Sequence, residues 1–269
     1  MTKDSITKID PTELNADLLI AVSFGLFVPP KLIRAVDSTI NVHPSLLPRH
    51  RGPAPIHHAI ASGDQQTGVS LQTLSPDGFD QGIIFDQSLP IDIEENELLT
   101  SLWDRLAIVG ADMLVSSIRN RTYLNPQPIQ TFTNPSYAGP IHKHVDWNIT
   151  YADKILRLGR VHDPVTGAIT LGEGRRIDIL LNGIHPREQH SKRPPGSYAV
   201  ARDKETGETK MFVVCADGKT VWIDQVKVSG KNWISGVQFV ASASDRFWAS
   251  KFVPWRREFE DHDPKEFEY

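Results

Sequence analysis

An asparagine, a histidine and an aspartate are the residues of this chain whose types and spacing best suit acid–base chemistry. Asn41 and His43 come at the end of an expected strand over residues 38–42. Side chains at positions i and i+2 of a strand share a face, so these two project together from its carboxyl end, where open α/β sheets bind ligands. Asp80 lies in the glycine-bounded loop 77–82. Because this loop joins two expected strands, its carboxylate can lie beside His43.

These three groups include no serine or cysteine nucleophile activated by a base, and they fit direct transfer of an acyl group to an amine. Asn41 would polarise the acyl oxygen, while His43 would donate a proton or stabilise the oxyanion. Asp80 would support His43 and help to remove the amine proton. Taken singly, His43 suits a structural histidine and Asp80 suits a turn residue. Their joint pattern favours catalysis.

The segment that follows His43 is a rigid loop. Pro44 and Pro48 fix φ on either side of residues 45–47, so the backbone has little freedom and can form a wall of a binding site. Arg49 and Arg51 follow in the same loop. Either arginine could contact a phosphate or brace the loop, and the sequence favours neither role.

The elements around this site alternate between strands and helices. The nearly unbroken apolar run at residues 17–24 is typical of a parallel strand that is covered on both faces. Hydrophobic spacing and turn residues predict the other elements. Further strands are expected at 38–42, 67–74 and 82–89, and helices at 30–36, 55–62 and 96–120. This order predicts an α/β layer architecture.

Residues 121–141 are rich in proline and turn residues and read as a linker. They separate an expected catalytic domain at 1–120 from a second domain at 142–269. The second domain consists mainly of short β runs with turn signals between them, which predicts a small β-barrel of the oligonucleotide-binding type. Its strands are expected at 176–181, 197–202, 211–216 and 220–228, and its helices at 151–158 and 236–248.

Composition excludes some classes of protein. Of 269 residues, 39% are hydrophobic and 23% are charged, as in a globular protein, and no apolar run approaches the length of a membrane span. The first ten residues carry no readable targeting segment. The single cysteine, Cys215, cannot form an internal disulfide, and we interpret it as a small buried hydrophobe.

Charge is unevenly distributed along the chain. Residues 1–141 hold 9 basic and 15 acidic residues, a net −6, whereas residues 142–269 hold 20 and 18, a net +2. Without the acidic tail, residues 142–257 hold 19 basic and 12 acidic residues, a net +7. A basic second half suggests an anionic partner such as nucleic acid. Ordinary solvated charge explains the same numbers, and on charge alone we slightly favour it.

The run from Asn41 to Pro48, followed by Asp80-Gln81-Gly82, resembles the formyltransferases that use 10-formyltetrahydrofolate as co-substrate. The resemblance implies a Rossmann-like parallel sheet, an Asn–His–Asp catalytic set and no metal. It also implies a folate site. By position, the residues that would line this site are Ser45, Leu46, Leu47 and Pro48, with the backbone around Gly25 and Leu26 meeting the pterin ring.

Within that family, the run Arg51 to Ile56 and the segment 137–147 are similar to the enzymes that formylate methionyl initiator tRNA. This similarity implies that initiator methionyl-tRNA is the partner, that the second domain binds tRNA and that the protein is a monomer. It would act in the mitochondrial matrix in a eukaryote or in the cytoplasm of a bacterium. Glycinamide ribonucleotide formyltransferase and an inactive homologue that binds tRNA are the alternatives.

The chain departs from the family pattern at three places. His50 stands where a tryptophan is usual, and Pro53 stands where an alanine is usual. In the family, further βα units precede the strand that begins near Asp17, and we expect them to be lacking here. Leu18 to Val22 would then form an apolar edge strand, an arrangement that folded proteins avoid.

Overall fold

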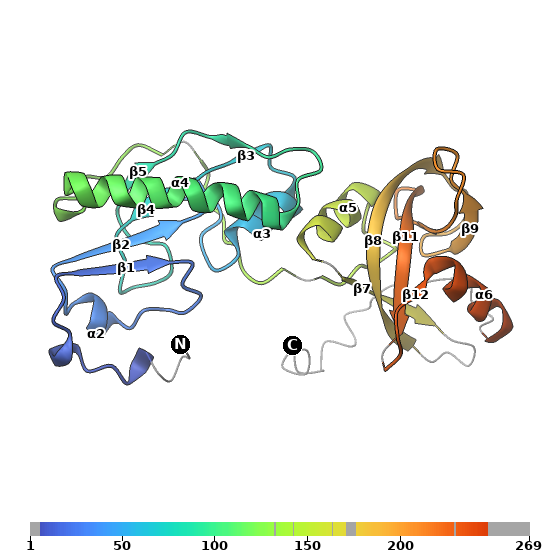
Figure 1. Ribbon diagram of the computed structural model, residues 1–269, viewed down its shortest axis with the longest axis horizontal. Helices are drawn as coiled ribbons and strands as arrows, with labels where there is room; N and C mark the ends of the chain where they lie inside the picture. Colours follow the sequence, from blue (N-terminus) through green and yellow to red (C-terminus); the bar gives the residue numbers. More distant parts are fainter. Residues whose placement is uncertain are drawn as a thin grey trace. The chain divides into compact units, whose positions relative to one another are not determined.

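The computed structural model describes residues 6–131, 133–141, 143–162, 164–170, 176–228 and 230–246. The chain forms two compact units, Met1–Ile141 and His142–Tyr269. Each unit has its own sheet and its own helices (Figure 1). We therefore describe each unit by itself.

The main sheet of the first unit has four strands in the order β1-β2-β4-β5. Its strands are β1 (Leu18–Val22), β2 (Ser38–His43), β4 (Ser70–Gln72) and β5 (Ile84–Gln87). Only β1 and β2 are parallel. β4 runs antiparallel to β2, and β5 runs antiparallel to β4. The expected parallel sheet is therefore wrong for β4 and β5. β4 begins beside the end of β2, where Ser70 pairs with His43, so the chain returns in the opposite direction.

Short helices and one long helix accompany this sheet. They are η1 (Pro11–Glu13), α2 (Pro30–Ile33), α3 (Pro55–Ser62), α4 (Leu99–Asn120) and η2 (Thr122–Leu124). α4 lies across one face of the sheet (Figure 1) and buries Leu102 and Leu106. Gly110 permits close packing, because a Cβ there would lie 2.9 Å from Cγ1 of Val42 in β2. A separate pair, β3 (Gln66–Thr67) and β6 (Ile91–Asp92), is antiparallel.

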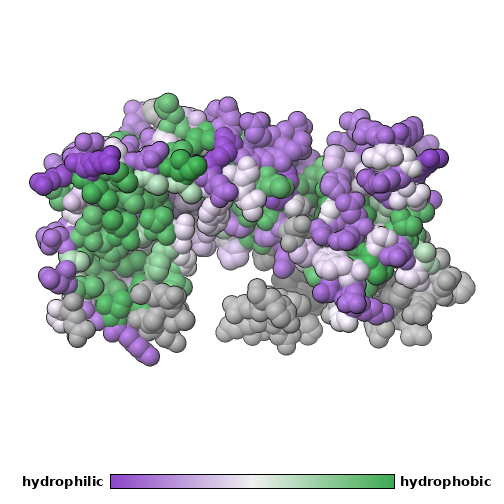
Figure 2. All heavy atoms as spheres, in the orientation of Figure 1, coloured by the Kyte–Doolittle hydropathy of each residue, from purple (hydrophilic) through white to green (hydrophobic). Residues whose placement is uncertain are grey.

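β1 is an edge strand of the described sheet, because β2 is its one neighbour among the described residues. Ile20 and Val22 share a face of the strand and are 41% and 53% exposed. Figure 2 shows hydrophobic residues gathered on this side of the first unit, over β1 and the region around it. The expected apolar edge is therefore present in the structure.

Part of the segment interpreted as a linker lies against the loop that follows His43, residues 44–54. The main-chain N–H of Arg51 donates to the carbonyl oxygen of Ser136 (2.8 Å), and the N–H of Ala138 donates back to the carbonyl oxygen of Arg51 (2.5 Å). The N–H of Ala54 in turn donates to the carbonyl oxygen of Ala138 (3.1 Å). Residues 133–139, which we call the strap, therefore form a short backbone ladder with the loop.

The second unit is built on an antiparallel sheet in the order β7-β8-β11-β10-β9, with β12 beside β11. Its elements are α5 (Ala152–Val161), β7 (Val165–Thr170), β8 (Arg176–His190), β9 (Tyr198–Arg202), β10 (Thr209–Val214), β11 (Lys219–Val228), β12 (Ile234–Ser235) and α6 (Gly236–Arg246). Within the described residues, β7 and β9 end the sheet and are not paired with each other. The expected closed barrel is therefore not confirmed. The end of the last expected helix, residues 247–248, lies outside the described residues.

The core of the second unit includes Trp147 and Ile155, both fully buried. Cys215 is also buried, and burial raises the pKa of its thiol to about 12, so the thiolate is scarce at neutral pH. This agrees with its interpretation as a small hydrophobe. No helix among the described residues of the chain is long and apolar enough to cross a membrane.

Candidate active site

The strand β2 places the first two predicted residues at one end of the sheet. Asn41 pairs with Gln72 and His43 pairs with Ser70 across β2 and β4, so both lie where β2 ends and the loop 44–54 begins. His43 is 5% exposed. The alternation of side chains along β2 brings the amide and the imidazole to the same face, as the spacing predicted.

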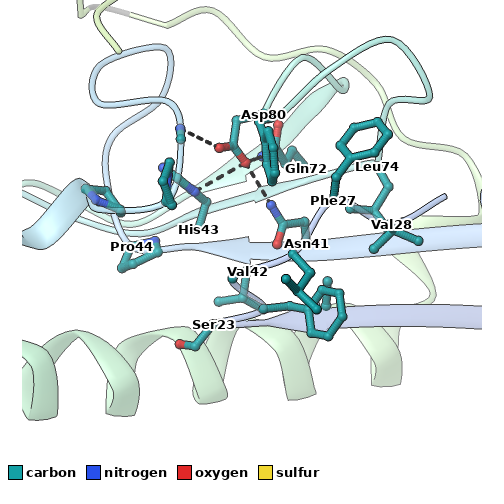
Figure 3. Close-up of a pocket in the computed structure, with 18 of the residues that line it drawn as sticks. Ser23, Phe27, Val28, Asn41, Val42, His43, Pro44, Gln72, Leu74 and Asp80 are labelled. Atoms are coloured by element: carbon teal, nitrogen blue, oxygen red, sulfur yellow. Dashed lines mark hydrogen bonds and ion pairs between the residues drawn. The ribbon is translucent and has the colours of Figure 1, made fainter. Parts of the chain in front are cut away.

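The carboxylate of Asp80 joins these residues. Its Oδ1 accepts hydrogen bonds from Nδ2 of Asn41 (3.0 Å) and Nε2 of Gln72 (2.6 Å), and its Oδ2 accepts one from the main-chain N–H of Gly52 (2.7 Å). Nδ1 of His43 lies 3.3 Å from Oδ1 (Figure 3). Three elements distant in sequence therefore converge on one carboxylate.

The ring of His43 faces a hydrogen-bond acceptor at each nitrogen. Nε2 lies 2.9 Å from the main-chain carbonyl oxygen of His50, and Nδ1 faces Asp80. A carbonyl and a carboxylate oxygen can only accept, so a neutral ring satisfies one of them and an imidazolium satisfies both. Burial is the largest influence on the pKa of His43 and lowers it, while the charge of Asp80 and the His50 carbonyl act in the opposite direction.

A pocket opens beside this cluster. It is lined by Asn41, His43, Gln72 and Asp80 on its polar side. Its other walls are largely apolar and include Phe24, Leu26, Phe27, Val28, Leu74 and Phe79. The rings of Phe27 and Phe79 meet edge to face with centroids 5.3 Å apart. The pocket can therefore hold a flat, mostly apolar ligand with its reactive group at the polar side.

The structure divides the residues predicted to bind the co-substrate into two groups. Gly25 and Leu26 line the pocket. The four loop residues are not among its lining residues. Oγ of Ser45 donates to the carbonyl oxygen of Arg49 (2.6 Å), and Leu47 is fully buried. Ser45 and Leu47 therefore support the fold of the loop, and the lining of a folate site by Ser45, Leu46, Leu47 and Pro48 stays a prediction.

Sequence reasoning missed Gln72 as a site residue. It is buried, and in the expected strand at 67–74 it is one of several polar residues, so the sequence did not mark it. Its importance depends on the register of β4 against β2, which sequence does not reveal. Among the described residues, there is no group of three or more His, Cys, Asp or Glu side chains that could hold a metal ion.

Two roles were open for Arg49 and Arg51, and Arg49 braces the loop. Its guanidinium forms a two-pronged ion pair with Asp64, with Nε 2.7 Å from Oδ2 and Nη2 2.5 Å from Oδ1. Nε2 of His50 also lies 2.8 Å from Oδ2 of Asp64. Burial would raise the pKa of Asp64, but hydrogen bonds from His50 and Arg49 outweigh it and lower the pKa to about 2.

Comparison with known proteins places both units in one family. Residues 4–118 match the family described as formyl transferase, and residues 140–244 match the formyl transferase C-terminal domain. Among solved structures, HypX from Aquifex aeolicus, in a complex with tetrahydrofolic acid, has a similar fold. For this complex the TM-score is 0.59 at 18% identity, and the match covers 89% of this chain and 42% of HypX.

Curated relatives extend the comparison. The mitochondrial methionyl-tRNA formyltransferase of Saccharomyces cerevisiae is 41% identical over 172 residues, which cover 54% of this chain. The methionyl-tRNA formyltransferases of Streptococcus gordonii and Streptococcus pneumoniae are 32% and 31% identical and cover 81% and 88% of it. The chain spans 43% of the length of the yeast protein and 67% and 76% of the streptococcal proteins. The chain therefore belongs to the formyltransferase family, in the branch of the methionyl-tRNA formyltransferases.

Proposed function

We propose that this chain carries the active site of a methionyl-tRNA formyltransferase. The reaction would move a formyl group from 10-formyltetrahydrofolate to the amine of methionine esterified to initiator tRNA. The observation that carries the proposal is the hydrogen-bonded cluster of Asn41, His43 and Asp80 beside a pocket with apolar walls. Family membership supports the same reaction.

Each residue of the cluster has a chemical task in this reaction. A bond forms between the amine nitrogen and the formyl carbon, and the bond from that carbon to N10 of the folate breaks. The amine loses a proton, and N10 gains one. Asn41 would donate to the formyl oxygen as negative charge develops on it, because one N–H of its amide remains after the bond to Asp80.

His43 and Asp80 would transfer the proton from the amine to N10 of the folate. A neutral His43 ring that donates from Nε2 to His50 has a free electron pair at Nδ1, close to Asp80. A proton taken from the amine at Nδ1 completes the hydrogen bond with the carboxylate, so protonation of the ring and support by Asp80 are linked. The proton can then pass to the departing N10.

The pocket also suits the co-substrate. Gly25 and Leu26 line it, and a Cβ on Gly25 would meet no atom within 4 Å, which leaves space for a planar pterin ring. We further propose that the second unit binds the tRNA, as the basic composition of residues 142–257 suggests. That the protein is a monomer, and that it acts in a mitochondrial matrix or a bacterial cytoplasm, stay predictions.

An assay with methionyl initiator tRNA and 10-formyltetrahydrofolate tests the proposal. We expect formylation by the unmodified chain, and a loss of about 100-fold or more in His43→Ala and Asp80→Ala, since general acid–base catalysis contributes about that much. Leu89→Ala, at a position in the first unit that is 85% exposed and outside the pocket lining, is a control that should retain activity. Intact tRNA binding without turnover would favour an inactive homologue, and formylation of glycinamide ribonucleotide alone would favour the other alternative.

A further inference from the structure

The main-chain carbonyl of His50 influences the orientation and the tautomer of the His43 ring. Its oxygen lies 2.9 Å from Nε2 of His43, whereas Oδ1 of Asp80 lies 3.3 Å from Nδ1, so a neutral ring that keeps the shorter contact carries its proton on Nε2. The other ring nitrogen, Nδ1, is thereby left toward Asp80. A shift of this carbonyl would free the ring to take the other tautomer or to rotate.

The backbone of His50 does not adopt this position without support. Its φ is +58°, in the left-handed region, which costs a residue with a Cβ roughly 1 kcal/mol or more. Three contacts hold it. Its N–H donates to Oγ of Ser136 in the strap (2.8 Å), and Nε2 of its ring lies 2.8 Å from Oδ2 of Asp64. Nδ1 of the same ring lies 3.4 Å from Oγ of Ser136. The side chain is almost fully buried.

The anchor at Asp64 is itself fixed and charged. Arg49 donates hydrogen bonds to both of its carboxylate oxygens. The hydrogen bonds from His50 and Arg49 keep Asp64 ionised at neutral pH. A carboxylate only accepts, so Nε2 of His50 donates to it. The result is a continuous chain of contacts from Asp64 and Ser136, through His50, to His43.

We propose that Asp64 and Ser136 are positioning residues that act through His50 to orient the catalytic His43. The inference rests on the proposed function, because His43 is catalytic only in that reaction. Asp64, Ser136 and His50 do not line the pocket. Changes at these positions should therefore affect kcat and leave the KM for the formyl donor unchanged.

A pair of variants of similar size isolates the ring contact. His50→Gln keeps an N–H that can donate to Asp64, whereas His50→Met keeps the length of the side chain without a donor. We expect His50→Met to lower kcat about 10- to 100-fold, since misplacement of a catalytic group costs about that much. We expect His50→Gln to stay within about threefold of the unmodified chain, and neither variant to change the KM for the formyl donor.

Asp64→Asn has a matched control in the same unit. Glu97 is buried and forms a comparable ion pair with Arg105 (2.7 Å), away from the pocket. Asp64→Asn and Glu97→Gln should both lower the free energy of unfolding measured with urea, because each weakens a buried pair. Only Asp64→Asn should also lower kcat. A similar fall of kcat in Glu97→Gln would overturn the positioning role.

NMR of the His43 ring gives a readout independent of turnover. With histidine labelled at both nitrogens, and with His43→Gln used for assignment, the unmodified chain should show the Nε2–H tautomer at a pH well above the pKa. His50→Met, Asp64→Asn and Ser136→Ala should show a mixture of tautomers. Unchanged tautomer and kcat in these three variants of an active chain would overturn the inference. An inactive unmodified chain with the expected ring signals would instead overturn the proposed function.

Discussion

At the scale of single residues, the site is organised around a carboxylate. Asp80 accepts from Asn41, Gln72 and the backbone of Gly52, and it faces Nδ1 of His43. A carboxylate can accept several hydrogen bonds at once, which is why one aspartate can hold an amide and an imidazole in a fixed relation. The proposed catalytic set is therefore a connected unit in which each side chain orients the next.

The titration of His43 follows from its surroundings. The groups that face its ring are Asp80 and His50, and burial dominates, so we expect its pKa to lie below the ordinary value of 6.5. Asp80→Asn should lower the pKa further, because the charge of Asp80 favours the imidazolium. The chemical shift of the ring C–H protons against pH measures both values. A pKa that rises in Asp80→Asn would contradict this account.

The same shift has a consequence for stability. Because the folded pKa of His43 lies below the unfolded value, the unfolded state binds more protons between the two. The contribution of His43 to the free energy of unfolding therefore declines as the pH falls from 6.5 through that window. Replacing His43 by glutamine should remove this part of the pH dependence.

At the scale of elements, the bounds of some segments follow from local chemistry. α3 begins at Pro55, whose ring suits the first turn of a helix, and ends before Gly63, whose φ of +79° is left-handed. Both signals are in the sequence, and the helix predicted at 55–62 is confirmed. The direction of β4 was not predicted correctly, because a strand carries no local mark of the direction in which its neighbour runs.

The free edge of β1 should make the chain prone to aggregation. Among the described residues β1 pairs with β2 alone, Ile20 and Val22 are exposed, and lysine on such an edge discourages pairing with other chains. We expect Val22→Lys to raise the temperature at which light scattering begins on heating. Leu89→Lys adds the same charge at a position that is 85% exposed and away from β1, so it is the control. An equal effect of both substitutions would show that charge alone is responsible.

At the scale of the whole molecule, the candidate active site and the net positive charge are found in different units. The candidate site lies within residues 1–141, whose net charge is −6, while residues 142–257 carry a net +7. A polyanionic partner is attracted by the second and repelled by the first. The proposed division of labour is therefore binding of tRNA by the second unit and formyl transfer in the first.

This division predicts different salt dependences for the two substrates. Raising salt from about 50 to about 200 mM should raise the KM for methionyl-tRNA about tenfold or more, because each phosphate contact releases counterions. The KM for the formyl donor should change less than about twofold, since the pocket that would hold it is largely apolar. Steady-state kinetics with each substrate varied in turn measures both. Equal changes would contradict the separation of roles.

The sequence by itself determined the identity of the proposed catalytic residues and most of the elements that carry them. Strand alternation placed Asn41 and His43 on one face, and the glycine-bounded loop identified Asp80. Only the tertiary structure decided that Gln72 and the backbone of Gly52 complete the cluster, and that His50 connects it to Asp64. Those contacts join residues 8 to 28 positions apart, and periodicity along a chain carries no information about such distances.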